Sequence, residues 1–585
     1  MPPSRDLHAR NGGTSLASPW FLGVLLIAAA WWALDLGVLR AGVPHPSDDH
    51  WEDLLIARHL AAGEGMRTPL IYPPLWELRD PQTLTIPVLV HGPLLALISV
   101  PLLSTFGPHA LDSFAPFAAL CALLALIPIF HMGARHFGAP VGAAAAGLFT
   151  LSPLTLEAVH HSGSVVMGAA LIAWTIDLIA RPRPLPLVAG LVAGVSYLVR
   201  PETLVAMPVL AGLAGFAAAS AGGARWPARG ASAQMTGFIA AGTLALAFAV
   251  VALPWWIHHL SVVGSPLFNL SSYTLIGFWG ARPDVTVMQD FSLTPERWPA
   301  VMRAELPGMS DKWFAFFPHA VKNALFTPSG ATGWLVPIGL LAALAGFGRP
   351  RSGHAAPRTA READPAPARR FAFAAILLAM IPMASMTLTA HQRLYLLPFA
   401  PLFAIGAAVG ASVVVRAMPA WAQRPRTWCG VLALLMLPSA LPALTSAADE
   451  ARVLERRLAS EREAIEHAFA ITGVADSSFA AGDSTSMRGS IANPGTTPRL
   501  LFSDTPDYVA WVTGLPTAWV MRAEFERLYP PGGGAGDAAR FNLPPRDEVA
   551  GWFHEDFRDP KSVGVVVRAT ASDTANAFEE AVARP

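Results

Sequence analysis

Four carboxylates lie close together in VPHPSDDHWED, the stretch of chain from Val43 to Asp53. Asp48 and Asp49 are adjacent, and a carboxylate of such a pair can accept a proton from an attacking hydroxyl or amide group. Glu52 and Asp53 instead precede LLIARHLAAGEG, a pattern typical of an amphipathic helix at the membrane interface with acids in its first turn. We therefore expect Asp48 and Asp49 to carry the chemistry, and the other two acids to act only on the helix.

Histidines and arginines stand at the ends of several apolar segments further along the chain. With their polar neighbours, these residues are His160, His161, Arg200, Glu202, His258, His259, His391, Gln392 and Arg393. An ionisable residue at membrane depth is costly and tends to line a pathway or a site, although each one alone could be an interfacial anchor or a helix cap. Arginine and histidine can stabilise a departing phosphate, and arginine can do so with two parallel hydrogen bonds. Beside a carboxylate pair, they are the groups needed to transfer a sugar from a lipid-linked sugar phosphate.

The apolar segments that must position these groups are long enough to cross a bilayer. Trp20 to Leu39 is almost uniformly apolar, and a helix of that length spans a hydrocarbon core of about 30 Å. The chain of 585 residues is 53% hydrophobic and only 14% charged, with a mean hydropathy of +0.43. We predict twelve candidate spans, near residues 19–39, 86–106, 113–131, 139–157, 163–180, 184–199, 203–221, 236–260, 331–348, 371–388, 394–415 and 427–446.

The charges around these spans predict their orientation. Arg5 and Arg10 precede the first span, so the positive-inside rule places the N-terminus in the cytoplasm and the acidic stretch outside. No small-residue cleavage site follows this span, and we expect an uncleaved anchor. The basic loop Arg349–Arg370 is then cytoplasmic, and the C-terminal tail lies outside. These two ends require an odd number of crossings, so we expect 11 or 13 helices, with 86–106 as a candidate re-entrant segment.

The composition becomes that of a soluble domain from Ala447 onward. Short strand-like runs, Arg499 to Phe502 and Val565 to Val567, alternate with PDYVAWVTG and RDEVAGWFHEDF, which we expect to be helical. The tail is therefore expected to form a small extracytoplasmic α/β domain. The net charge of zero gives no sign of nucleic-acid binding, and two cysteines do not indicate a disulfide framework. The expected divisions are a transmembrane module over 1–446, with outer loops at 40–85 and 262–330, and the tail domain over 447–585.

Five landmarks in the transmembrane module, in this order, resemble those of the C-type glycosyltransferases (GT-C). The particular group is the bacterial one similar to protein O-mannosyltransferases and to the aminoarabinose transferase that modifies lipid A. The landmarks are HPSDDHWEDLLIARHLAAGEG, VHGPLLALISVPLLSTFG, YLVRPETL, PWWIHHLSVVGSPLFNLSSY and HQRLYLLPFAPLFAIGA, with LLFSDTPDYVAWVTG in the tail. The resemblance covers nearly the whole chain. It implies a mainly α, polytopic transmembrane helical bundle with a small C-terminal α/β domain, and a polyprenyl-phosphate-linked sugar donor.

The resemblance also implies roles for single residues. An acidic pair in the first outer loop is the catalytic feature of the family, so Asp48 and Asp49 are the catalytic candidates, with Asp49 at the position most often acidic. Arg393 matches the basic residue before the aromatic-Leu-Leu-Pro run, although the usual Arg-Tyr is here Arg-Leu-Tyr, and Arg200 matches the arginine of an Arg-Pro-Glu element. The candidate substrate-binding residues are His91, Arg200, Glu202, His258, His259, His391, Arg393 and Tyr395.

The chain departs from the family pattern at three places. HGP at 91–93 stands where relatives often have two prolines, HH at 258–259 replaces the usual Arg-Asn, and HHSGSVVMG stands where many relatives have another acidic residue. Phosphate contacts made partly by histidine would make binding sensitive to pH near about 6.5. A divalent metal held by Asp48, Asp49 and histidines is the competing interpretation, although the sequence contains no spaced ligand signature.

These features favour a glycosyltransferase of the bacterial inner membrane that moves a hexose or pentose onto a cell-envelope glycan, a lipid or a protein. Asp49 would act as general base or orient the acceptor, and an Arg/His cluster would hold the lipid phosphate. A transporter or flippase of lipid-linked sugars should show repeated halves with broken helices, and we find no such repeat. A catalytically inactive GT-C subunit for binding or assembly should have lost the acidic pair, which is present.

Overall fold

The chain forms two compact units in the computed structural model. We call Met1–Gly42, Phe114–Trp256 and Ser310–Asp449 the helical unit, and Val43–Ser113, Ile257–Met309 and Glu450–Pro585 the mixed unit. The mixed unit thus joins the greater part of both predicted outer loops to the tail. The structure describes residues 17–39, 48–106, 113–221, 231–270, 291, 293–326, 330–345, 393–442, 444–445, 500–503, 509–510, 515–520, 525, 527–528, 537–541, 543, 549–553 and 565–568.

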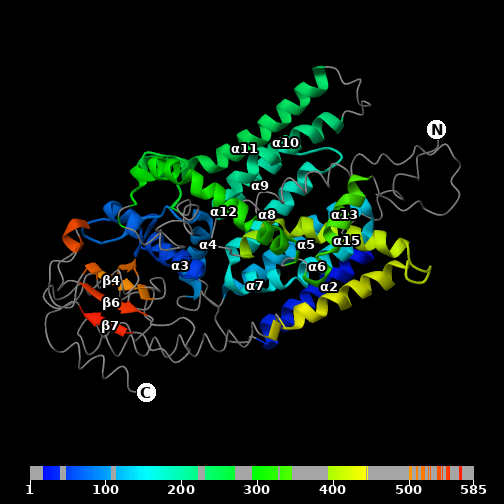
Figure 1. Cartoon of the computed structure of the whole chain (residues 1–585), viewed down its shortest axis with the longest axis horizontal. Helices are drawn as coiled ribbons and strands as arrows, with labels where there is room; N and C mark the ends of the chain where they lie inside the picture. Colours follow the sequence, from blue (N-terminus) through cyan, green and yellow to red (C-terminus); the bar gives the residue numbers. More distant parts are fainter. Residues whose placement is uncertain are drawn as a thin grey trace. The chain divides into compact units, whose positions relative to one another are not determined.

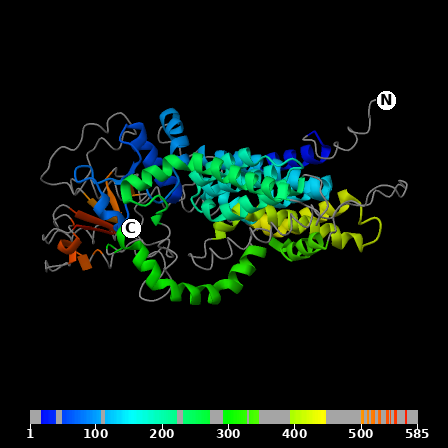
Figure 2. The same cartoon turned by 90° about the horizontal axis from the view of Figure 1, so that it is seen from above.

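Apolar helices make up the helical unit. Figure 1 shows α5, α6, α8 and α9 packed side by side, and Figure 2 shows the same unit from above. α11 (Ala231–Val263) and α12 (Trp298–Phe326) each contribute residues to both units, and residues 425–442 are helical as well. The other elements are α2 (Pro19–Leu34), η1 (Asp35–Leu39), α5 (Phe114–Phe137), α6 (Ala139–Thr150), α7 (Pro153–His161), α8 (Gly163–Ile179), α9 (Pro186–Val199), α10 (Thr203–Ala221), α13 (Leu335–Leu344), η8 (Arg393–Phe399) and α15 (Ala400–Arg416).

Several of the described helices are long and apolar enough to cross a membrane, which confirms the predicted class of multi-pass helical protein. α6 and α7 pass the same test only as a pair, bent by 50° where Pro153 prevents α6 from continuing. Of the twelve predicted spans, 371–388 lies outside the described residues, and the number of crossings stays a prediction. The five single-helix candidates are Pro19–Gly37, Phe114–Phe137, Thr203–Ser220, Gln234–Val263 and Leu396–Arg416.

Glycines allow the helices of this unit to approach one another closely. A Cβ added to Gly339 of α13 would lie 1.9 Å from the carbonyl oxygen of Gly406 on α15. One added to Gly133 of α5 would lie 2.6 Å from the Cα of Gly142 on α6. Helices in lipid gain little from the hydrophobic effect and depend on such backbone contact for their packing.

A five-stranded sheet organises the mixed unit. Its strands, in spatial order, are β2 (Leu70–Ile71), β5 (Thr517–Trp519), β4 (Leu500–Ser503), β6 (Val549–Phe553) and β7 (Val565–Arg568). Neighbouring strands are parallel except for β6 and β7, which are antiparallel. β2 belongs to the first outer loop, and its Leu70 and Ile71 pair with Thr517 and Ala518 of β5. The sheet of the tail therefore includes a strand from the first outer loop.

Two strands predicted in the tail are confirmed as β4 and β7, whereas one predicted helix is wrong. RDEVAGWFHEDF contains β6, which pairs with β4 on one side and β7 on the other. Val549, Trp552 and Phe553 favour an extended conformation, and Gly551 disfavours a helix. The two neighbouring strands outweigh the helical pattern that charged residues suggest at both ends of this segment.

The first outer loop is folded along its whole described length. The predicted span 86–106 is helical only from Pro93, because Ile86 pairs with Thr68 in an antiparallel ladder. The region expected as the second outer loop contains a 3-10 turn and the whole of the 29-residue helix α12. The remaining elements of the mixed unit are α3 (Asp48–Ala61), β1 (Arg67–Thr68), η2 (Pro73–Leu78), β3 (Ile86–Pro87), α4 (Pro93–Phe106), η6 (Pro295–Arg297) and η11 (Asp537–Phe541).

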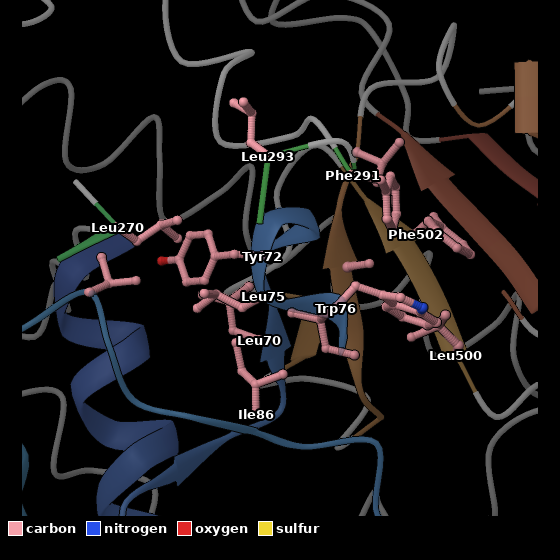
Figure 3. Packing of buried hydrophobic residues seen from close by; sticks show 14 of the residues in the cluster. Leu70, Tyr72, Leu75, Trp76, Ile86, Leu270, Phe291, Leu293, Leu500 and Phe502 are labelled. Atoms are coloured by element: carbon pink, nitrogen blue, oxygen red, sulfur yellow. The ribbon is translucent and has the colours of Figure 1, made fainter. Parts of the chain in front are cut away.

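One hydrophobic core joins both outer loops to the tail (Figure 3). Trp76 of the first loop meets Phe291 of the second loop edge to face, with ring centroids 5.9 Å apart. Because the three segments bury their apolar side chains against one another, none of them has a complete core of its own. Among the core residues are Leu70, Tyr72, Leu75, Trp76 and Ile86 of the first loop, Leu270, Phe291 and Leu293 of the second, and Leu500 and Phe502 of β4.

Candidate functional site

The predicted catalytic pair opens α3. Asp48 and Asp49 are the first two residues of this helix, where its dipole favours negative charge, and their side chains lie outside the described part of the structure. The interpretation of Glu52 and Asp53 as first-turn acids of an interfacial helix is wrong, because they are only 2% and 4% exposed. The residues that follow them, 54–57, are buried as well. α3 is therefore a buried element of the mixed unit.

Glu52 lies in a cluster with buried Tyr72 and partly exposed His91 that sequence reasoning missed. Its Oε2 accepts a hydrogen bond from the Tyr72 hydroxyl at 2.8 Å and lies 2.8 Å from Nε2 of His91. The Glu52 side chain is 3% exposed, and its Oε1 is buried with no hydrogen-bond partner among the described residues. Residues three and four apart share a helix face, so Glu52 lies on the face of Asp48 and Asp49. That spacing is the signal that could have found it.

The end of α11 and the segment that follows it hold the backbone next to His91. His258 donates a hydrogen bond from Nε2 to the carbonyl oxygen of Val88 at 3.1 Å. Asn269 donates from its side-chain amide to the carbonyl oxygen of Val90 at 3.0 Å. Each bond satisfies a main-chain carbonyl oxygen that would otherwise need water. Together they hold the backbone immediately before His91 in place.

His259 of α11 bonds to the segment that follows this helix. Its side chain is buried, and Nδ1 donates to the carbonyl oxygen of Phe268 at 2.5 Å. A carbonyl oxygen can only accept, so the ring carries a proton on Nδ1 in this contact. His258 and His259 therefore shape the loop in this structure, and their contact with a lipid phosphate stays a prediction.

Arg200 and Glu202, both predicted site residues of the helical unit, contact each other. Arg200 caps the end of α9, and its guanidinium donates to Oγ of Ser164 at 3.2 Å and to Oε1 of Glu202 at 3.0 Å. The Arg200 stem lies against Gly168 of α8, where an added Cβ would be 3.2 Å from Cγ of Arg200. The Arg200 side chain is 13% exposed and is held between the start of α8 and the end of α9. Its contact with a phosphate stays a prediction.

His160 has a buried partner that sequence reasoning missed. Its Nε2 lies 2.6 Å from Oδ2 of Asp35, and both side chains are fully buried. Asp35 opens η1, a π-helical turn at the end of α2. Such turns are frequent at functional sites, and an acid within an apolar run was the signal that could have found this pair.

Several predicted site residues are not placed by the structure. His391 lies outside the described residues, and η8 includes the backbone of Arg393 and Tyr395 but not their side chains. The expected cavity shared by the acids and the cations therefore stays a prediction. Among the residues that the structure describes, no three His, Cys, Asp or Glu side chains are grouped to hold a metal ion, and the side chains of Asp48 and Asp49 are not among them.

A pocket of about 310 Å³ lies in the mixed unit. The guanidinium of Arg79 is stacked 3.8 Å from the ring centre of Trp76. Burial lowers the pKa of Arg79, but an arginine retains its charge at neutral pH. Both loops and the tail contribute to the pocket, whose lining residues are Pro73, Pro74, Trp76, Glu77, Arg79, Phe291, Thr294 and Arg540.

Comparison with known proteins places the fold but finds no match in sequence. No family model matches the chain, and no curated protein matches it. The crystal structure of the Archaeoglobus fulgidus oligosaccharyltransferase with Zn and sulfate has a TM-score of 0.54 at 15% identity, over 91% of this chain and 68% of that one. The structure of ArnT from Cupriavidus metallidurans bound to undecaprenyl phosphate has a TM-score of 0.51 at 14% identity, over 95% of this chain and 99% of that one. The chain therefore shares its fold with these two proteins, as the GT-C resemblance predicts.

Proposed function

We propose that this protein is a membrane glycosyltransferase that moves a sugar from a polyprenyl-phosphate donor to an extracytoplasmic acceptor. The observation that carries the proposal is the acidic pair at the start of α3, in a chain that shares its fold with ArnT over nearly the full length of both proteins. The ArnT structure is bound to undecaprenyl phosphate, the product that such a donor leaves behind. Undecaprenyl phosphate is therefore the lipid we propose for this chain, in the bacterial inner membrane.

In the proposed reaction, Asp49 accepts the proton of an acceptor hydroxyl or amide. The deprotonated atom attacks the anomeric carbon of the donor sugar, and the bond from that carbon to the phosphate oxygen breaks. The electron pair of this bond leaves with the phosphate, which becomes a dianion. General-base assistance of this kind contributes about 10²- to 10⁴-fold to a reaction rate. Asp48 beside it orients the acceptor.

Cationic side chains would stabilise the departing phosphate. Arg200 is the best supported, because its guanidinium is preorganised by Ser164 and Glu202 and remains partly exposed. Preorganised donors are effective because they need no rearrangement as charge develops. His91, and also Arg393 and the other candidate histidines, would complete the phosphate contacts.

The pocket of the mixed unit is the proposed acceptor site. Its size lies at the lower end of the range for small-molecule sites, and its arginines and indole can bind polar and ring-shaped parts of a glycan. Arg540 belongs to η11 in the tail, which agrees with a tail that selects the acceptor without supplying the catalytic base. A cell-envelope glycan, a lipid or a protein would each satisfy this arrangement.

The experiment is a transfer assay with the purified full-length protein in detergent or liposomes. A panel of undecaprenyl-phosphate hexoses and pentoses is supplied, and released undecaprenyl phosphate is measured by mass spectrometry. Release that requires the protein and an acceptor supports the proposal, and the sugar that is consumed identifies the donor. A flippase would move a fluorescent donor across the liposome bilayer without releasing lipid phosphate, and that result would refute the proposal.

A further inference from the structure

Among the described residues from 48 to 92, two Glu–His pairs occur, and they differ in burial. Glu64 pairs with Nδ1 of His59, and its side chain is 51% exposed. Glu52 pairs with Nε2 of His91, and its side chain is 3% exposed. An exposed pair contributes little because water and salt screen it. A buried carboxylate loses its hydration, which lowers the stability of the folded protein. The Glu52 pair therefore needs an explanation that the Glu64 pair does not.

The Glu52 carboxylate is held from two sides. Tyr72 directly follows β2, and its ring packs edge to face on Trp519 of β5, with centroids 6.0 Å apart at 75°. Figure 3 shows the Tyr72 ring within the core with its hydroxyl pointing toward α3. The hydroxyl donates to Glu52 at 2.8 Å. The sheet therefore fixes the hydroxyl, and the hydroxyl fixes the carboxylate.

The Glu52 carboxylate in turn holds Nε2 of His91. The same oxygen that accepts from Tyr72 is 2.8 Å from Nε2 of His91, while the hydrogen bonds to Val88 and Val90 fix the preceding backbone. The partner of one ring nitrogen sets the orientation and tautomer of an imidazole.

We propose that Glu52 is a positioning residue that fixes the His91 imidazole to bind the phosphate of the polyprenyl lipid. This inference rests on the proposed function, because it uses the same lipid phosphate. Glu52 itself does not touch the lipid. Removal of the carboxylate takes away the partner of Nε2, so the His91 ring loses a contact that sets its orientation. The loss should be of the size found when the partner that orients a metal-binding histidine is removed, about 10- to 100-fold.

The test is a double-mutant cycle in the affinity of the full-length protein for undecaprenyl phosphate, measured by tryptophan fluorescence in detergent. Glu52→Gln and His91→Asn should each raise Kd at least tenfold. The double variant should bind about as weakly as the weaker single variant, because both substitutions disable one unit. Glu64→Gln is the matched control, since it breaks the exposed pair, and its Kd should equal that of the wild type.

Multiplying effects in the double variant, or unchanged affinity in either single variant, would overturn the inference. Where Glu52→Gln does not fold, Glu52→Asp keeps the charge but shortens the reach to His91. It should bind more weakly than the wild type, and equal affinity would also overturn the inference. A wild-type protein that binds the lipid phosphate in this way but releases none from any sugar donor would refute the proposed function and leave the inference standing.

Discussion

Leu70→Ala should destabilise the tail as well as the first outer loop. Leu70 is 1% exposed, lies on β2 and packs in the core that contains Leu500 and Phe502 of β4. Truncation of a buried leucine costs about 2–5 kcal/mol, from lost transfer free energy and the cavity that remains. Because β2 pairs with β5, the substitution should lower the free energy needed to open the whole sheet.

This free energy converts into a protease-accessible population. Each 1.4 kcal/mol is about a factor of ten, so a loss of at least 2 kcal/mol raises the open population at least about thirtyfold. Cleavage follows the open population when closing is faster than cleavage. Limited proteolysis of the purified protein, with a C-terminal tag to report cleavage within the tail, should therefore proceed at least about thirtyfold faster than in the wild type.

Leu267→Ala is the matched control. It removes the same atoms from a residue of the mixed unit that is 60% exposed, and its proteolysis should remain near the wild-type rate. Leu70→Ala with wild-type cleavage of the tail would show that the tail folds independently of the first loop. That result would refute the shared core.

Three further predictions concern packing, pH and the acceptor. Gly339→Ala should force α13 and α15 apart and lower stability by about 1–3 kcal/mol, read as a lower Tm. Gly242→Ala should not, because its added Cβ has no atom within 4 Å apart from its chain neighbours and the nearby backbone of its own helix. Burial lowers the pKa of His59 in the folded protein, so the folded state favours the neutral ring. The stability that depends on this neutral ring is complete above about pH 6.5, the pKa of an unfolded histidine. It is lost as the pH falls through the lower pKa of the folded state, because the unfolded chain takes up the proton first. The Tm of the wild type should accordingly fall more steeply on acidification than that of His59→Gln, and parallel curves would contradict this. Arg540→Ala should raise KM for the natural acceptor several-fold while leaving undecaprenyl-phosphate affinity unchanged, and an unchanged KM would exclude the pocket as the acceptor site.

The sequence predicts the helical part of this fold well because bilayer thickness imposes a length and a composition on each span. The run from Trp20 to Leu39 illustrates this, since α2 and η1 occupy it. The break between α6 and α7 also has a local cause in Pro153. The landmarks of the GT-C resemblance add the order in which these elements occur.

The contacts that the sequence does not predict join residues far apart in the chain. Glu52 looks like a solvated first-turn acid, because its burial depends on Tyr72, 20 residues later. Asp35 contacts His160, which lies 125 residues later in the chain. Such pairings have no periodic signal of their own.

The mixed unit has the same property on a larger scale. A boundary at 447 follows from the change in composition, but composition does not report which strands pair. β2 is only two residues long, and its pairing with β5 follows from the fold of the whole unit. The helix predicted at β6 is wrong for a related reason, because the two partner strands of β6 lie outside its own segment.

The central claim is that an acid at the start of α3 is the catalytic base, and Asp49→Asn tests it most directly. Release of undecaprenyl phosphate from the sugar donor, measured by mass spectrometry with the purified full-length protein, should fall about 10²- to 10⁴-fold. Asp48→Asn should be less severe. The Tm should change little, because a first-turn acid contributes only about 0.3–1 kcal/mol through the helix dipole. Wild-type turnover by folded Asp49→Asn would contradict the account.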